Sequence, residues 1–163
     1  MLHIDPTASV SPLADLEKSV RGTRIVIGPG AVIDSFVKIK PAGGHGDVII
    51  GAHVYLNSGT TIYTGNGVVI GEDTLIAANC TLAPTNHEFG NPDVPIRLQG
   101  FQKSRGGIVI GRDVWIGANT VILDGAVIGD GCVIGAASLV RGNLEGFGIY
   151  AGNPLRRVGN RGV

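Results

Sequence analysis

Aliphatic residues return at every sixth position along most of this chain. The series runs through Ile27, Ile33, Ile39; Ile50, Leu56, Ile62; Ile70, Ile76, Leu82; Ile110, Ile116, Ile122; and Ile128, Ile134, Val140. An amphipathic helix would space apolar residues by three and four, and a half-buried strand would space them by two. A period of six fits neither pattern. It predicts an all-β parallel β-helix, in which each six-residue unit is a short strand plus a turn and three units make one coil.

A second set of small or β-branched residues stands four places after these aliphatic positions. The set is Ala31, Val37, Val54, Thr60, Thr74, Cys80, Val114, Thr120, Ala126, Cys132 and Ser138. Such residues suit an inward position beside a tight corner. Both cysteines belong to this set, so we expect compact buried thiols and no disulfide. Glycine often follows the aliphatic position (28, 51, 71, 111, 117, 129 and 135), as expected where the backbone turns without room for Cβ.

Three expansions interrupt the repeat, and counting residues locates them. One surrounds Gly43-Gly44-His45 and another surrounds Gly65-Asn66-Gly67. The third lies between Leu82 and Ile110, where the step is 28 residues instead of six. Long loops on rigid scaffolds often carry function. The sequence therefore predicts a solenoid with one long extruded loop, and we place the active-site loop at residues 83–107.

Composition supports one domain over residues 1–163, with 44% hydrophobic and only 5% aromatic residues. Residues 1–22 repeat less regularly and predict an irregular first coil or a cap, and residues 144–163 predict a C-terminal tail. Thirteen basic and thirteen acidic side chains give no formal net charge. The total charge therefore gives no reason to expect nucleic acid or an anionic membrane as a partner. No stretch has the length of a transmembrane segment and no leader pattern opens the chain, so we expect a cytoplasmic protein.

Specific motifs surround and follow the long loop. They are Asn86-His87, Pro95-Ile96, Gln99-Gly100, Val114-Trp115-Ile116-Gly117-Ala118 and Tyr150-Ala151-Gly152-Asn153-Pro154. With these motifs the chain resembles the hexapeptide-repeat acyltransferases, most of all the maltose, galactoside and polysaccharide O-acetyltransferase branch. The resemblance covers roughly residues 25–158. It implies a left-handed β-helix, acetyl-CoA as co-substrate with no metal, and a homotrimer with active sites between subunits.

His87 is the candidate catalytic residue. Moving an acetyl group from a thioester to a hydroxyl needs a base beside the hydroxyl, and imidazole has a suitable pKa near neutrality. The resemblance implies that the histidine at this position deprotonates the acceptor, whereas a loop histidine that only packs is the alternative. No serine or cysteine lies in a recognisable nucleophile motif, so we expect direct transfer without an acyl-enzyme.

Three residues are candidates for binding the acceptor. Asn57 matches a position at which the galactoside and maltose enzymes hold the sugar, although it can also be a turn residue. Glu88 either orients the imidazole or faces solvent. Trp115 follows the inward Val114 and should face outward, where it packs against the loop or a neighbouring subunit or forms a wall of the CoA or acceptor channel. Related enzymes carry acidic residues where this chain has Tyr63-Thr64-Gly65, which leaves the acceptor open.

The resemblance also implies a set of CoA-binding residues. Backbone groups cradle the pantetheine arm around small residues, and cations near the C-terminus meet the 3′-phosphate. The matching positions are Gly117, Ala118, Ala136, Ala137, Arg141, Arg156 and Arg157. A guanidinium binds phosphate well. Gly142 stands where relatives often have lysine, and solvated surface arginine is the alternative for each of the three.

We therefore predict an acetyl-CoA-dependent O-acetyltransferase that acts on a hydroxyl of a sugar or glycan precursor, in polysaccharide biosynthesis. N-acetylation of an amino sugar nucleotide is the main alternative, followed by O-acetylation of an antibiotic such as chloramphenicol or a streptogramin. A γ-class carbonic anhydrase shares the fold but needs three converging histidines, and His45, His53 and His87 lack that spacing. A noncatalytic scaffold is disfavoured by the presence of His87 and Trp115.

Overall fold

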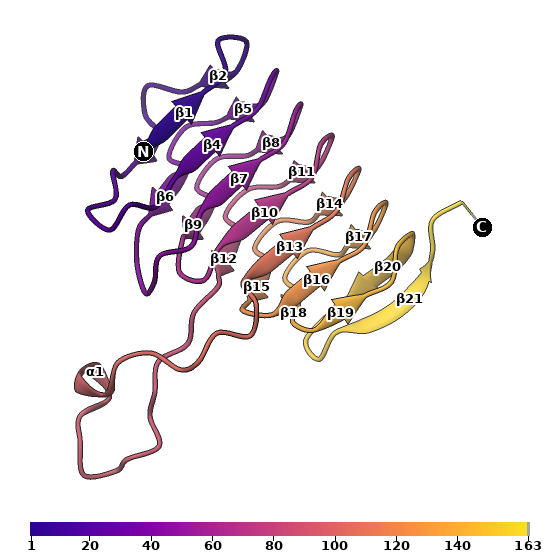
Figure 1. Cartoon of the computed structure of the whole chain (residues 1–163). Helices are drawn as coiled ribbons and strands as arrows, with labels where there is room; N and C mark the ends of the chain where they lie inside the picture. The colour runs from indigo at the N-terminus through magenta and orange to yellow at the C-terminus, as the bar shows by residue number, and fades with distance from the viewer. Residues whose placement is uncertain (163) are drawn as a thin grey trace.

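Three parallel sheets surround one aliphatic core in the computed structural model, which describes residues 1–162 (Figure 1). The chain visits sheets A, B and C in turn and rises by one strand layer with each coil. The expected left-handed parallel β-helix is confirmed. Val163, the last residue of the expected tail, lies outside the described residues.

The strands are short, because each one supplies a single side of a triangular coil. Sheet A contains β1 (Leu2–Ile4), β4 (Ile25–Ile27), β7 (Val48–Ile50), β10 (Val68–Ile70), β13 (Ile108–Ile110), β16 (Ala126–Ile128) and β19 (Asn143–Leu144). Sheet B contains β2 (Ser9–Val10), β5 (Val32–Ile33), β8 (Tyr55–Leu56), β11 (Leu75–Ile76), β14 (Trp115–Ile116), β17 (Val133–Ile134), β20 (Gly148–Ala151) and β21 (Arg156–Asn160). Sheet C contains β3 (Asp15–Leu16), β6 (Lys38–Lys40), β9 (Thr61–Tyr63), β12 (Thr81–Ala83), β15 (Val121–Leu123) and β18 (Leu139–Val140).

The core consists of three stacks of aliphatic side chains, one behind each sheet. In sheet C, Leu82 lies between Ile62 and Ile122, its partners in the coils on either side. All fifteen positions predicted from the period of six are buried. The prediction succeeds because every inward residue meets the equivalent residue of the next coil, so one local pattern specifies the whole stack.

The small residues near the corners are also buried, as predicted. Cys80 and Cys132 are fully enclosed and unpaired. Burial raises the pKa of both thiols, because the charged thiolate would lose its hydration. Each thiol instead donates to a backbone carbonyl, Cys80 to Gly117 at 3.3 Å and Cys132 to Glu145 at 3.1 Å. Both cysteines therefore act as small core residues.

The glycines after the aliphatic positions are needed because stacked corners approach closely. A Cβ on Gly71 would lie 2.5 Å from the carbonyl carbon of Gly111 in the next coil. Real Cβ atoms do not approach backbone so closely. The left-handed backbone conformation falls two residues later and is adopted there even by Asp73 and Asp113. Close packing, and not an unusual φ, explains this set of glycines.

The two ends of the solenoid differ. At the start, β1, β2 and β3 pair in parallel with β4, β5 and β6 and form a coil. At the other end, β21 turns back and pairs antiparallel with β20, which covers the last edge of sheet B. Over residues 1–162, no helix has the length and apolarity needed to cross a membrane. The expected cytoplasmic location stays a prediction.

Candidate active site

The long insertion leaves the solenoid between β12 and β13 and projects from it as a hairpin whose far end opens into a wide loop that carries α1 (Ile96–Gln99) (Figure 1). Residues 86–88 run antiparallel to residues 100–102. His87 and Phe101 are directly opposite each other, and backbone hydrogen bonds of 2.8 and 3.0 Å flank the pair. The hairpin stem therefore holds His87 in an ordered position close to the coils.

The His87 side chain is exposed and rests on an aromatic ring. The centroids of the His87 and Phe101 rings are 4.7 Å apart, with an interplanar angle of 31°. Glu88 turns elsewhere, because its Oε1 accepts hydrogen bonds of 2.9 Å from the amides of Phe89 and Gly90. An exposed imidazole in a fixed place can take a proton from an incoming hydroxyl, and the Glu88 carboxylate stabilises its own turn.

The return of the loop is held by Asp124, which was not among the predicted site residues. Asp124 is only 4% exposed. Its Oδ2 accepts the amide of Arg105 at 2.8 Å and its Oδ1 accepts the amide of Gly107 at 2.9 Å. The signal in the sequence is an acidic residue directly after the Val121–Leu123 strand, where equivalent coils have Thr64 and Pro84. Asp124 thus fixes one leg of the hairpin to the solenoid.

Substituting Asp124 by alanine is expected to loosen this leg. The buried Gly107 amide left without an acceptor costs about 1–3 kcal/mol, which lowers the melting temperature of a chain this long by roughly 2–12 °C. Trypsin should then cut faster after Lys103 and Arg105. Asp93→Ala, at an exposed position of the same loop, is the matched control and should change neither quantity. Equal tryptic rates in the two variants would contradict an anchoring role for Asp124.

The predicted pantetheine residues form one edge of sheet C. Gly117 and Ala118 precede β15, and Ala136 and Ala137 occupy the same corner one coil later. The Ala137 amide donates to the Ala118 carbonyl at 2.8 Å, and a Cβ on Gly117 would lie 2.5 Å from the Ala136 nitrogen. Ala136 and Ala137 are exposed. Stacking therefore requires glycine at position 117, whereas the exposed alanines leave a shallow surface along which an extended ligand could lie.

The three predicted arginines lie around one cavity of about 220 Å³ near the C-terminal end. The Arg157 guanidinium already has partners within the chain. It pairs with Glu145 at 2.7 Å, and its Cζ lies 5.9 Å from the centroid of the Tyr150 ring. Arg156 donates to the Leu155 carbonyl at 3.1 Å. Arg141 also lines a second cavity of about 250 Å³ at the base of the hairpin, together with Asn86, Phe89, Gln102, Arg105, Leu123 and Asp124. Arg141 thus lines both cavities, the one shared by the three arginines and the one at the base of the hairpin.

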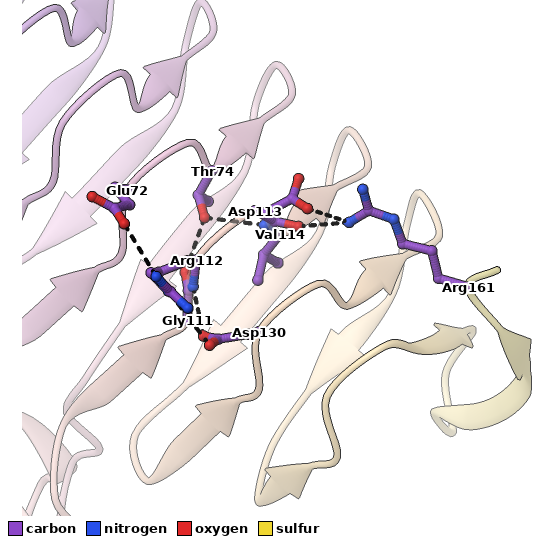
Figure 2. Close-up of polar contacts among 8 residues, drawn as sticks. All are labelled: Glu72, Thr74, Gly111, Arg112, Asp113, Val114, Asp130 and Arg161. Atoms are coloured by element: carbon purple, nitrogen blue, oxygen red, sulfur yellow. Dashed lines mark hydrogen bonds and ion pairs between the residues drawn. The ribbon is translucent and has the colours of Figure 1, made fainter.

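Trp115 faces outward on sheet B, as predicted, and is 52% exposed. Its strand neighbours are Leu75 and Val133. Beside the indole lies a cavity of about 390 Å³, lined by Asp73, Leu75, Asp113, Val114, Trp115, Val133 and Arg161. Figure 2 shows Arg161, just after β21, reaching Asp113, where it makes an ion pair of 2.8 Å. The C-terminal segment therefore forms one wall of the cavity next to Trp115.

Asn57 lies at the corner between sheets B and C. Its side-chain amide donates to the carbonyl of Ile76 in the next coil at 2.9 Å. This contact is the one expected of a turn residue. The remaining oxygen of the half-buried side chain is the part that an acceptor could contact.

The other histidines are dispersed. His45 contacts the Arg21 carbonyl at 3.3 Å, and His53 lies 3.1 Å from Asp73 at a different corner. Among residues 1–162, no three histidine, cysteine, aspartate or glutamate side chains gather as a metal site would require.

One chain does not bring His87 and the small-residue corner together. The hairpin leaves sheet C after β12, at the edge where strands end, whereas Ala118 and Ala136 lie at the edge where strands begin. A strand of three residues separates the two edges by ~10 Å. Trp115 lies on β14 of sheet B, two residues before Gly117.

Comparisons with known proteins agree with this architecture. The family model described as bacterial transferase hexapeptide (six repeats) matches residues 107–142. The chain is 32% identical over 144 residues to the putative lipopolysaccharide biosynthesis O-acetyl transferase WbbJ of Escherichia coli K12, which covers 84% of this chain and 69% of that protein. It is 39% identical over 112 residues to the galactoside O-acetyltransferase of the same organism, covering 69% and 53%. The chain thus spans about two thirds of the first relative and about half of the second.

A solved structure shares the fold over nearly the whole chain. AntD, an N-acyltransferase from Bacillus cereus in complex with dTDP and 3-hydroxybutyryl-CoA, superposes with a TM-score of 0.81. The match covers 98% of this chain and 82% of AntD, at 24% identity. At this identity the comparison establishes a common fold.

Proposed function

The chain belongs to the hexapeptide-repeat acyltransferases, and we propose that within this family it moves an acetyl group from acetyl-CoA to a hydroxyl of a sugar or glycan precursor. One observation carries the proposal: the exposed imidazole of His87, held on an ordered hairpin stem beside the coils. The similarity to a lipopolysaccharide O-acetyl transferase supports a glycan acceptor.

In the proposed reaction His87 acts as general base. Its imidazole takes the proton of the acceptor hydroxyl as the oxygen forms a bond to the acetyl carbonyl carbon. The carbon–sulfur bond of the thioester then breaks, and the leaving thiolate receives the proton from the imidazolium. No side chain becomes acylated, which agrees with the buried, protonated state of both cysteines.

The residues proposed for CoA fit an extended, anionic ligand. Ala136 and Ala137 leave an exposed low surface along one edge of sheet C. Arg141 and Arg156 line the cationic cavity without an ion-pair partner among residues 1–162. A phosphate bound there would gain charge-assisted hydrogen bonds, so these two side chains are better candidates than Arg157, which is held by Glu145.

We propose a homotrimer with the active site between copies, because His87 and the small-residue corner lie at opposite edges of sheet C in one chain. In such an assembly the His87 hairpin of one copy faces the small-residue corner and Trp115 of the next copy. Rows of exposed apolar side chains support association: Val69, Val109 and Val127 follow one another on sheet A, and Leu75 and Trp115 on sheet B. Burying such side chains between copies is favourable.

An acceptor screen tests the proposed function. The measurement is release of the CoA thiol from acetyl-CoA in the presence of sugars, amino sugar nucleotides, chloramphenicol and a streptogramin. We expect the highest kcat/KM with an acceptor that offers a sugar hydroxyl. A nucleotide-linked amine as the best substrate would support N-acetylation instead, and an antibiotic would support drug modification. No release with any acceptor, together with no acetyl-CoA binding by calorimetry, would support a noncatalytic scaffold.

A further inference from the structure

The proposed base His87 lies against an aromatic ring and has no hydrogen-bond partner for its imidazole among residues 1–162. Phe101, opposite it on the hairpin stem, presents its ring at 4.7 Å between centroids. Cross-strand pairs of this kind stabilise one relative arrangement of the two side chains. The flanking backbone hydrogen bonds fix both Cα positions. The direction of the imidazole therefore depends on where the Phe101 ring lies.

The Phe101 ring is in turn seated on the solenoid. On Gly43, a Cβ would lie 3.1 Å from Cε1 of Phe101 and 2.7 Å from the methyl carbon of Thr85. Thr85 enters the hairpin and its methyl group packs on Gly65, where a Cβ would overlap it. The seat consists of two glycines, Gly43 and Gly65, one from each small expansion of the repeat. A Cβ at either position would overlap the Thr85 methyl group, so the Thr85 side chain or the base of the hairpin would have to shift.

We infer that Phe101, seated on Gly43, is a positioning residue for His87. The inference rests on the proposed role of His87 as base. An exposed histidine side chain without support populates several rotamers, of which one suits proton transfer. Misplacement of a reacting group by about 1 Å can cost 100-fold in rate. Contact with Phe101 keeps the imidazole in one place before the acceptor arrives.

The test compares Phe101→Leu with Phe101→Tyr. Leucine removes the ring and should lower kcat by about 10–100-fold, with the KM for acetyl-CoA changed less than twofold, because Phe101 is not among the residues proposed to bind CoA. Tyrosine keeps the ring and should restore kcat to within about threefold of the unmodified protein. Leu98→Ala, on exposed α1 of the same hairpin, is the control and should leave kcat unchanged.

Nuclear magnetic resonance of the His87 ring protons gives a readout that does not depend on catalysis. Loss of the Phe101 ring current should move these resonances in Phe101→Leu and leave them nearly in place in Phe101→Tyr. Gly43→Ala keeps the ring but displaces it, so it should move the same resonances and lower kcat.

The outcomes separate this inference from the proposed function. If His87→Ala is inactive but Phe101→Leu keeps full kcat, the positioning role is wrong and the base stands. If His87→Ala keeps full activity, the proposed base itself is wrong. If Phe101→Leu lowers kcat without moving the His87 resonances, the effect does not pass through His87 and the inference is overturned.

Discussion

Replacing His87 by alanine is expected to lower kcat for acetyl transfer by about 10²–10⁴-fold, the usual contribution of a general base. The side chain is exposed, and its removal leaves the backbone bonds of the hairpin stem in place. The KM for acetyl-CoA and the melting temperature should therefore change little. The measurement is CoA-thiol release with the best acceptor of the screen, beside a thermal melt of the same sample.

His3→Ala provides the matched control for this substitution. His3 is also an exposed histidine, but it lies on β1 in the first coil. Full activity in His3→Ala and a large loss in His87→Ala would assign the effect to the position and not to the residue type. Retention of more than about a tenth of kcat by His87→Ala would be too small a loss for the only base in the reaction, and the assignment would be withdrawn.

An experiment that mixes two inactive variants tests whether the active site lies between copies of the chain. Ala136→Trp should block the exposed corner proposed for CoA in its own chain, so this variant and His87→Ala should each be inactive. Refolded together into the proposed trimer, they should present an intact His87 to an intact corner at about one interface in four, if pairing is random. Roughly a quarter of the normal activity should return. No recovery would mean that one chain supplies both parts of the site.

The repeat allowed the solenoid to be predicted from sequence in detail. Each inward residue meets the equivalent residue one coil away, as Ile62, Leu82 and Ile122 do, so a local pattern with period six contains all the information that the core needs. Counting the interruptions also located the long insertion, since β12 ends at Ala83 and β13 begins at Ile108. The periodic part of the sequence therefore predicts the coils and their core.

The candidate site was less predictable, because its contacts are not periodic. Asp124 meets the amide of Arg105, and Phe101 meets Gly43 and His87, only because the hairpin returns to particular corners of particular coils. Counting residues located the expansion around Gly43, but it did not predict that Gly43 contacts the hairpin. Such contacts depend on the path of the hairpin, which no repeat in the sequence describes.

Leu82→Ala is expected to be the most destabilising of the simple substitutions near the hairpin. The side chain is fully buried between two aliphatic neighbours, and truncating leucine in a rigid core costs about 2–5 kcal/mol in the free energy of unfolding. For a chain of this length, the melting temperature should fall by roughly 4–20 °C. Thermal and urea unfolding followed by circular dichroism measure both quantities.

Val69→Ala is the control that shows whether the loss of stability in Leu82→Ala comes from burial of the side chain or only from its position in a strand. Val69 lies in the middle of β10, in the coil that also contains Leu82, but points outward and is 43% exposed. Its truncation leaves no cavity in the core, so in the single chain it should cost less than about 1 kcal/mol. Each coil contacts only the coils next to it. The cavity at Leu82 should therefore weaken its own coil, from which the hairpin emerges, before it weakens the other coils. Activity of Leu82→Ala should then be lost at a lower temperature than its β-structure, whereas simultaneous loss of both would show that the coils unfold as one unit.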